Sequence, residues 1–231
     1  MGGKTAEEIH IGKVRIALET AVDWLRDYTD AENNKTRSSP YAYPAYDDYE
    51  RDNNLPNQLT DADLLAPVLL NVGLSIRAFY GLQRIKPALN EGLASSHLQH
   101  PLADLDDLQI AATVRPLYGV LDDSQNRPRG VKATTLSKIL HRKAPQCLVL
   151  HDKWVRACYV GDQAPVPRAK KRSWADYMTA ITTAIANDIR DQPSEFAQLD
   201  AATDTPGRLS QVRLLDILAW KSQGNPSLAA Y

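Results

Sequence analysis

The stretch that decides the fold runs from Gly130 to Arg156 and reads GVKATTLSKILHRKAPQCLVLHDKWVR. It opens on a glycine turn, which is followed by a basic segment of helical composition at about residues 132–142. A short apolar segment then leads to Asp152, which opens a second basic helix at about residues 152–159. An acidic side chain among cations, at a fixed distance from a glycine turn, is typical of a protein that binds a polyanion and acts on it.

Charge is distributed unevenly along the chain. The 231 residues carry a net charge of −1, but residues 126–172 contain twelve Lys and Arg against two acids. This segment therefore carries +10 and the remainder −11. The asymmetry predicts a nucleic-acid-binding face on an otherwise acidic protein, although a solvated surface with a basic loop would give the same numbers.

Outside this stretch the pattern predicts an all-α fold. We expect one domain over residues 1–231, a two-lobed helical array with a helix–hairpin–helix motif at about 105–160. Thr60 and Asp63 are expected to cap a helix at its N-terminus, and QCLVLH at 146–151 is expected to be an extended connector. Further helices are predicted at about 5–28, 75–93, 105–121, 132–142, 152–159, 173–190 and 209–221.

Composition excludes several classes of protein. No apolar run approaches the roughly 18–20 residues that a membrane helix needs, and the first residues lack the apolar core of a secretory signal. Cys147 and Cys158 provide neither a disulfide framework nor a metal-ligand set. We therefore expect a cytoplasmic, monomeric protein with no membrane partner and no metal.

The turn before the first basic helix has the composition of a phosphate-binding site. Residues 122–130, DDSQNRPRG, end one helix and form a hairpin. Backbone N–H groups at the start of the next helix, with the helix dipole, would bind a phosphate. Side chains expected to add contacts are Arg127, Arg129, Lys132, Thr134 and Thr135. For Gly130 alone, an ordinary connection between two helices is the alternative.

Asp152 is expected to cap the second basic helix, which is the common role of an aspartate in that place. It lies 22 residues after Gly130, beside Lys153 and Arg156, whose charges favour its ionised form and which would contact a polyanion. A capping carboxylate whose second oxygen faces a cleft can also stabilise positive charge that develops on a substrate.

These residues resemble the helix–hairpin–helix DNA glycosylase superfamily, whose pattern is roughly L-P-G-V-G-x-K-T-A, then V-D-T-H-V-x-R. Gly130 and Val131 match the hairpin's Gly-Val, Asp152 the catalytic aspartate, and Val155 and Arg156 the V-x-R end. The chain also resembles an uncharacterised bacterial family of unknown function. That family carries H-R-K-x-P…D-x-x-V, as here at residues 141–145 and 152–155, and the similarity extends from the tyrosine-rich loop to the last helix.

The glycosylase resemblance implies hydrolysis of the N-glycosidic bond of a nucleotide flipped out of double-stranded DNA. Asp152 would stabilise the oxocarbenium-like sugar or deprotonate the attacking water. The nucleophilic lysine of bifunctional members falls at Thr134, which implies a monofunctional enzyme without β-lyase activity. Lys132 replaces the second hairpin glycine, which alters the turn or its phosphate contacts. No cysteine set matches an iron–sulfur loop, so no cofactor is expected beyond a monovalent cation at the hairpin carbonyls.

The walls of a base pocket are predicted from two regions. His151 and Trp154 flank Asp152 and could stack on a base, with Trp154 as a core anchor being the alternative. The tyrosine-rich loop at 30–58 would surround an enlarged base with Tyr41, Tyr43, Tyr46 and Tyr49, and Asp47 and Asp48 would bind a polar adduct. Surface tyrosines on an unanchored loop are the alternative. Because these parts differ from those of repair enzymes, an unusual substrate is expected, such as modified bacteriophage DNA in antiviral defence.

Two other functions remain open at this point. A non-catalytic DNA-binding module would keep the fold and excise nothing, and Lys132 and Thr134 at the positions of the missing glycine and lysine favour it. A helical protein–protein adaptor would present the basic face to an acidic partner. Its DNA binding would depend only weakly on salt.

Overall fold

A β-hairpin stands where the sequence predicted the first half of a helix. The computed structural model describes residues 7–53, 55–225 and 227–228. In it β1 (Glu8–Ile11) pairs antiparallel with β2 (Val14–Ala17), and the short β3 (Ser227–Leu228) pairs parallel with β2. The first long helix, α1 (Leu18–Thr29), begins only after β2. The predicted helix at 5–28 is therefore wrong before residue 18, and its residues 5 and 6 lie outside the described part.

The hairpin has a clear physical cause in its side chains. Ile9, Ile11, Val14 and Ile16 alternate with polar residues, and all four are fully buried. Gly12 turns the chain at a φ of +58°, a conformation that costs glycine little. The fold is thus mostly helical with one small sheet, and the all-α prediction is confirmed only in its coarse form.

Most of the predicted helices are confirmed within one to two residues at each end. These are α4 (Ile76–Leu93), α5 (Asp107–Gly119), α6 (Ala133–His141), α7 (Lys153–Tyr159), α8 (Trp174–Asp191) and α10 (Gln211–Ser222). The helix α9 (Pro193–Ala201) was not predicted. The remaining elements are short: α2 (Ala31–Asn34), α3 (Asp61–Leu65), and the 3-10 turns η1 (Arg51–Asn53), η2 (Ala66–Leu70), η3 (Ser96–Gln99) and η4 (Leu102–Asp104).

Polar side chains set several of these helix starts. The hydroxyl of Thr60 accepts a hydrogen bond from the N–H of Asp63, whose carboxylate accepts one from the N–H of Thr60, as predicted. The hydroxyls of Ser75, Ser173 and Ser210 each accept a hydrogen bond from the N–H three residues on and so cap α4, α8 and α10. These caps explain why the helix boundaries were predictable from the sequence.

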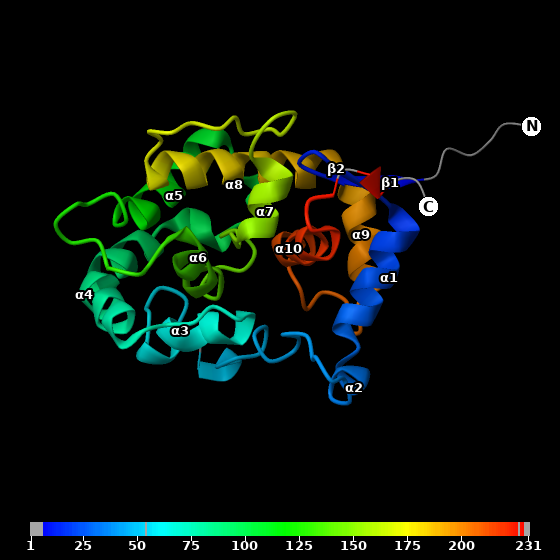
Figure 1. Cartoon of the computed structure of the whole chain (residues 1–231), viewed down its shortest axis with the longest axis horizontal. Coiled ribbons are helices and arrows are strands. Elements are labelled where there is room, and N and C mark those ends of the chain that lie inside the picture. The colour runs from blue at the N-terminus through cyan, green and yellow to red at the C-terminus, as the bar shows by residue number, and fades with distance from the viewer. Residues whose placement is uncertain (1–6, 54, 226, 229–231) are drawn as a thin grey trace, which may run out of the picture.

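One large apolar core joins the elements from β1 to α10. The long α8 packs along α5 and crosses the upper part of the molecule in the view of Figure 1. At one end the sheet lies with α1, α9 and α10, and at the other lie α3, α4 and α6 (Figure 1). The segment 146–151 pairs with no described strand, but it begins as a turn and is irregular only from 149, so the predicted extended connector is confirmed in part; it places Asp152 beside α6 and α10.

Candidate functional site

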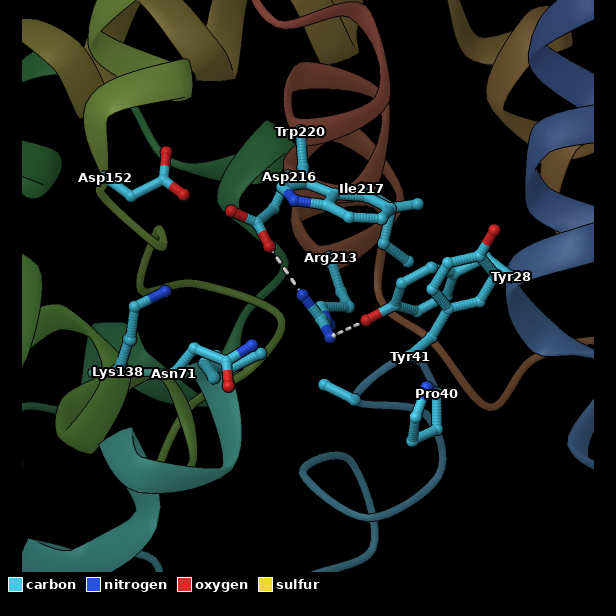
Figure 2. Close-up of a pocket in the computed structure, with 12 residues that line it drawn as sticks. Tyr28, Pro40, Tyr41, Asn71, Lys138, Asp152, Arg213, Asp216, Ile217 and Trp220 are labelled. Carbon is cyan, nitrogen blue, oxygen red and sulfur yellow. Dashed lines mark hydrogen bonds and ion pairs between the residues drawn. The ribbon is translucent and has the colours of Figure 1, made fainter. Parts of the chain in front are cut away.

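Asp152 caps α7 and faces a cavity. Its Oδ1 accepts hydrogen bonds from the backbone N–H groups of Trp154 at 2.7 Å and of Val155 at 3.0 Å. No described residue donates a hydrogen bond to its Oδ2. Figure 2 shows the carboxylate directed into the space between α6 and α10. The predicted cap is confirmed, and one oxygen of Asp152 is available to a bound molecule.

The cavity beside Asp152, which we call the aspartate cavity, is small and both polar and aromatic. It encloses about 110 Å³, whereas pockets for drug-sized ligands typically enclose about 300–1,000 Å³. Its walls come from α1, the loop at 40–42, the end of η2, α6, the start of α7 and α10 (Figure 2). The lining residues are Tyr28, Pro40, Tyr41, Ala42, Leu70, Asn71, Lys138, Asp152, Arg213, Asp216, Ile217 and Trp220.

Lys138 is the least expected side chain in the aspartate cavity. It lies on α6 and is only 4% exposed. Burial, the largest effect, lowers the pKa of its ammonium group, while the negative charges of Asp216 and Asp152 act in the opposite direction. Figure 2 shows the ammonium group and the two carboxylates pointing toward the same space. The burial of Lys138 was not predicted from the sequence; in the structure every residue of α6 except Thr134 is buried.

A buried charge network supports the opposite wall. The Arg213 guanidinium pairs with Asp47 at 2.8 Å and with Asp216, and it donates a hydrogen bond to the Tyr28 hydroxyl at 2.9 Å. Burial raises the pKa of the Asp216 carboxyl, although the charges of Arg213 and Lys138 oppose this shift. The network fixes the tyrosine-rich loop to α10, and sequence reasoning missed it.

The tyrosine-rich loop is anchored rather than loosely attached. Tyr41 lines the aspartate cavity and stacks on Tyr28, with ring centroids 5.1 Å apart and planes 15° apart. Tyr43 and Tyr46 are each 1% exposed, and the Tyr46 hydroxyl donates a hydrogen bond to the backbone oxygen of Lys138. Tyr49 lies under the Arg142 guanidinium at 5.1 Å.

Of the loop's predicted pocket residues, only Tyr41 lines the cavity of Asp152. Asp47 is paired with Arg213, and Asp48 with Arg208. Both carboxylates are therefore neutralised within the protein. Tyr43, Tyr46, Asp47, Asp48 and Tyr49 do not line the aspartate cavity, because they are engaged by the core, by these ion pairs or by Arg142.

The two residues predicted to flank Asp152 face elsewhere. The His151 Nε2 lies 3.1 Å from the Tyr177 hydroxyl, and His151 lines a second cavity beside α7 and α8. Trp154 is half-buried, and the Lys153 ammonium lies over its ring at 4.3 Å from the centroid. Neither His151 nor Trp154 lines the aspartate cavity.

The glycine turn packs against α4. Gly130 adopts a φ of +82°, which favours glycine, and it is exposed. Pro128 approaches the backbone of α4 at Gly81 so closely that a Cβ there would lie 2.7 Å from the Pro128 Cβ. Val131 is buried, and Lys132 occupies the N-cap of α6 without a side-chain cap, so the first N–H groups of α6 donate no hydrogen bond to a capping side chain.

Most of the side chains predicted to contact phosphate lie at the surface. Arg127, Arg129, Lys132, Lys153 and Arg156 are exposed, and Thr134 is half-exposed. Thr135 is 6% exposed, so the prediction of a phosphate contact is wrong for this side chain.

The basic segment at 126–172 is partly internal. Lys138, Arg142 and Lys143 are buried, and the Lys143 ammonium pairs with Asp63 at 2.6 Å. The Arg142 guanidinium donates a hydrogen bond to the backbone oxygen of Tyr46 at 2.8 Å. Nine of the twelve predicted surface cations are thus exposed or half-exposed, and the surface charge of the segment is smaller than the sequence indicated.

The helix pairing around the turn differs from a compact hairpin motif. The principal partners of α5 are α8 and α4, whereas α6 packs on η2 and α3. The two helices that flank the turn therefore find their main contacts on different neighbours.

Within the described residues, no helix is long and apolar enough to cross a membrane, and no group of three His, Cys, Asp or Glu could hold a metal ion.

Fold and site together define a mostly helical protein with a helix-capping aspartate in a polar and aromatic cavity. The chain belongs to the "Family of unknown function (DUF6308)", whose model matches residues 21–223 and so extends from α1 to α10. No curated protein and no solved structure matches the chain.

Proposed function

We propose that this chain is a monofunctional DNA glycosylase that hydrolyses the N-glycosidic bond of a modified base flipped out of double-stranded DNA. The observation that carries the proposal is that the two carboxylate oxygens of Asp152 have different roles. One carboxylate oxygen holds the start of α7, and the other is open toward a cavity with aromatic walls. A carboxylate fixed in this way is oriented before a substrate arrives.

The chemistry follows from that position. When the C1′–N bond breaks, the bonding electrons leave with the base and the sugar becomes oxocarbenium-like. Asp152 stabilises this cation and accepts the proton of the water whose oxygen bonds to C1′. Tyr41 and Trp220, which meet edge to face at 5.5 Å, would offer the base a stacking surface.

The start of α6 is the proposed phosphate site. Its N–H groups lack a side-chain cap, and Arg127, Arg129 and Lys132 are exposed beside it. Lys138 follows five residues after the first residue of α6, so this helix start lies about 7.5 Å along the axis from the aspartate cavity. In this proposal the glycine turn and the start of α6 hold the phosphate without the compact pairing of a helix–hairpin–helix motif, and a monomer binds the DNA in the cytoplasm.

A second candidate function is DNA binding without catalysis. The aspartate cavity, at about 110 Å³, is too small for a nucleotide unless a wall moves. The loop at 40–42 and the turn at Asn71 are the parts of the wall that belong to no long helix. If these segments stay in place, the same surface binds DNA and excises nothing.

The proposal is tested with duplexes that each carry one modified base, including modified bacteriophage DNA. Released base is measured by mass spectrometry, and abasic sites are measured by alkali-induced strand cleavage. We expect at least one modified duplex to release its base and to be cleaved only after alkali. Intact DNA in every case, with tight duplex binding retained, would favour the non-catalytic module.

Single cations at the start of α6 test the phosphate site. Lys132→Gln should weaken duplex binding for all sequences and lower the slope of log Kd against log salt by about 1, since one phosphate contact is lost. Lys35→Gln is the matched control, because Lys35 is paired with Glu32 at the end of α2, a helix that lies apart from α6 in Figure 1. Equal slopes for the two variants and the unmodified protein would remove this helix start from the DNA interface.

A further inference from the structure

A second cavity lies between α7, α8 and the loop at 161–172 that connects them. It encloses about 510 Å³ and is lined by residues on all three segments, which is within the range of about 300–1,000 Å³ typical of small-molecule sites. Its position relates it to the aspartate cavity: the successive residues His151 and Asp152 line the second and the first cavity, respectively. We call it the arginine cavity, after the side chains that dominate it.

Four cations line the arginine cavity, namely Arg156, Arg168, Lys170 and Arg172. No carboxylate of a described residue pairs with any of them. Other arginines of the chain do pair with carboxylates, as in the pairs Arg208–Asp48 and Arg213–Asp47. A group of unpaired like charges around one cavity is unfavourable by itself, and an anion bound among them would relieve the repulsion.

Two acidic side chains at the start of α8, Asp176 on the helix and Asp122 from the loop after α5, are already engaged. Asp176 pairs with Arg115 at 2.7 Å and accepts a hydrogen bond from Ser173. Asp122, in the loop after α5, accepts hydrogen bonds from the N–H groups of Trp174 and Ala175 at the start of α8. Neither carboxylate lines the arginine cavity, so all the charged side chains that line it are positive.

Aromatic rings form the remaining wall. Trp174 meets Tyr177 edge to face at 5.8 Å, and Tyr177 meets His151 at 5.4 Å. Trp174 and Tyr177 are half-buried. The charges of Arg156 and Arg172 both act on the Tyr177 hydroxyl, although burial has the larger effect and raises its pKa. The cations and the rings therefore face the same space.

His151, which lines this wall, also carries a buried polar atom without a partner. Burial lowers its pKa to about 4, which leaves the imidazole neutral at physiological pH. Its Nε2 lies against the Tyr177 hydroxyl, while its Nδ1 is buried and has no hydrogen-bond partner among the described residues. Such an orphaned atom is costly unless a water or a ligand completes it.

Backbone geometry holds one of the cations in place. Gly161 has a φ of +129°, and a Cβ there would lie 3.2 Å from the Arg168 Nε. The guanidinium of Arg168 therefore packs on Gly161, where a side chain would displace it. Hydrogen bonds from Gly161 N–H to the Val166 oxygen and from Val166 N–H to the Tyr159 oxygen, both 3.0 Å, fix the start of the loop.

We infer that the arginine cavity binds a nucleotide, with the base against Trp174 and Tyr177 and the phosphate among Arg156, Arg168, Lys170 and Arg172. Guanidinium groups suit phosphate oxygens and aromatic faces alike, and a flat ring with an attached anion fits both parts of the wall. A free nucleoside phosphate and a nucleotide of a nucleic-acid strand share this chemistry. The inference does not depend on base excision at Asp152.

Calorimetric titration of the full chain tests the inference. The ligands are AMP, adenosine, inorganic phosphate and a short oligodeoxyadenylate, and the variant is the double substitution Arg168→Gln, Arg172→Gln. We expect AMP to bind at least about tenfold more tightly than adenosine or phosphate. In the double variant the affinity for AMP should fall by about tenfold or more, because two charge-assisted contacts to the phosphate are lost. Lys171→Gln is the matched control, because Lys171 is exposed and does not line the cavity.

The outcomes separate the sources of the nucleotide. If only the oligonucleotide binds, and the double variant weakens it while Lys171→Gln does not, the ligand belongs to a nucleic-acid strand. The inference fails if neither AMP nor the oligonucleotide binds at millimolar concentration, or if phosphate alone matches AMP. It also fails if the double variant binds as the unmodified protein does, or if Lys171→Gln weakens binding equally. Base release by the unmodified protein is measured separately and changes none of these conclusions.

Discussion

Lys138 and Asp152 illustrate what is decided at the scale of single residues. Asp152 could be predicted as a helix cap, because the signal is local: an aspartate before a basic helical segment. Lys138 could not be recognised, because its burial depends on α6 being covered on almost all sides by segments distant in sequence. Counting charges along the chain placed Lys138, Arg142 and Lys143 on the surface, whereas packing placed them inside.

The pH dependence of stability tests the environment of Lys138. Burial lowers its pKa in the folded protein, so above neutral pH the unfolded chain binds more protons at this residue and stability rises with pH. The gain begins as pH rises through the folded pKa and is complete near the unfolded value of about 10.4. Urea unfolding from pH 7 to 10 should show the unmodified protein gaining stability relative to Lys138→Met.

Lys171→Met provides the comparison for an exposed lysine. Its difference from the unmodified protein should stay constant over the same pH range. A constant difference for Lys138→Met as well would mean that the Lys138 ammonium is as well solvated in the folded protein as in the unfolded chain.

His141 has an effect of the same sign in an acidic pH range. Burial lowers its pKa to about 4, while its Nδ1 lies 2.7 Å from the Leu148 oxygen. Below about pH 6.5 the unfolded chain therefore gains a proton that the folded protein does not, and stability falls by up to about 1.4 kcal/mol per pH unit. Thermal unfolding of His141→Gln should show a shallower loss between pH 6.5 and 4. An unchanged slope would place His141 outside this effect.

At the scale of elements, hydrophobic period and capping residues predicted most of the long helices, and one competing pattern was misread. The buried residues at 9, 11, 14 and 16 alternate with period two around a Gly-Lys turn, which is the signal of a hairpin. Several of these positions also fit a helical period that continues into α1, and this period is what predicts a helix there. The missed α9 begins at Pro193 in its first turn, a local signal that was present in the sequence.

Gly12 tests the hairpin and its contact with α7. Its φ is +58°, and an added Cβ would overlap the backbone oxygen of Cys158, which also accepts a hydrogen bond from the N–H of Lys13. Gly12→Ala should therefore destabilise the protein by about 2 kcal/mol or more, from strain and overlap together. Urea unfolding measures the loss.

Gly73→Ala is the control for Gly12→Ala, because nothing lies within 4 Å of an added Cβ there and its φ is not in the positive range. It should change stability by less than about 0.5 kcal/mol. Equal effects of the two substitutions would contradict the described packing of the hairpin turn on the end of α7.

At the scale of the whole molecule, long-range contacts create the candidate site. The Arg213–Asp47 pair joins residues 166 positions apart and ties the tyrosine-rich loop to α10. Neither composition nor spacing could indicate which acids would be neutralised internally, so Asp47 and Asp48 were expected in a base pocket. Asp152 and Tyr41 do meet in one cavity, whereas His151 contributes to another. The sequence thus predicted the chemical groups better than their partners.

The most direct test of the central proposal compares base release from a reactive modified duplex by the unmodified protein, Asp152→Asn and Asp162→Asn. Asparagine caps a helix as well as aspartate does, so Asp152→Asn should keep its fold and its duplex affinity. We predict that it releases base at least about a hundredfold more slowly. Asp162→Asn, at the other acid of the basic segment, is exposed and should act at the normal rate. Equal rates for all three proteins would contradict a catalytic role of Asp152.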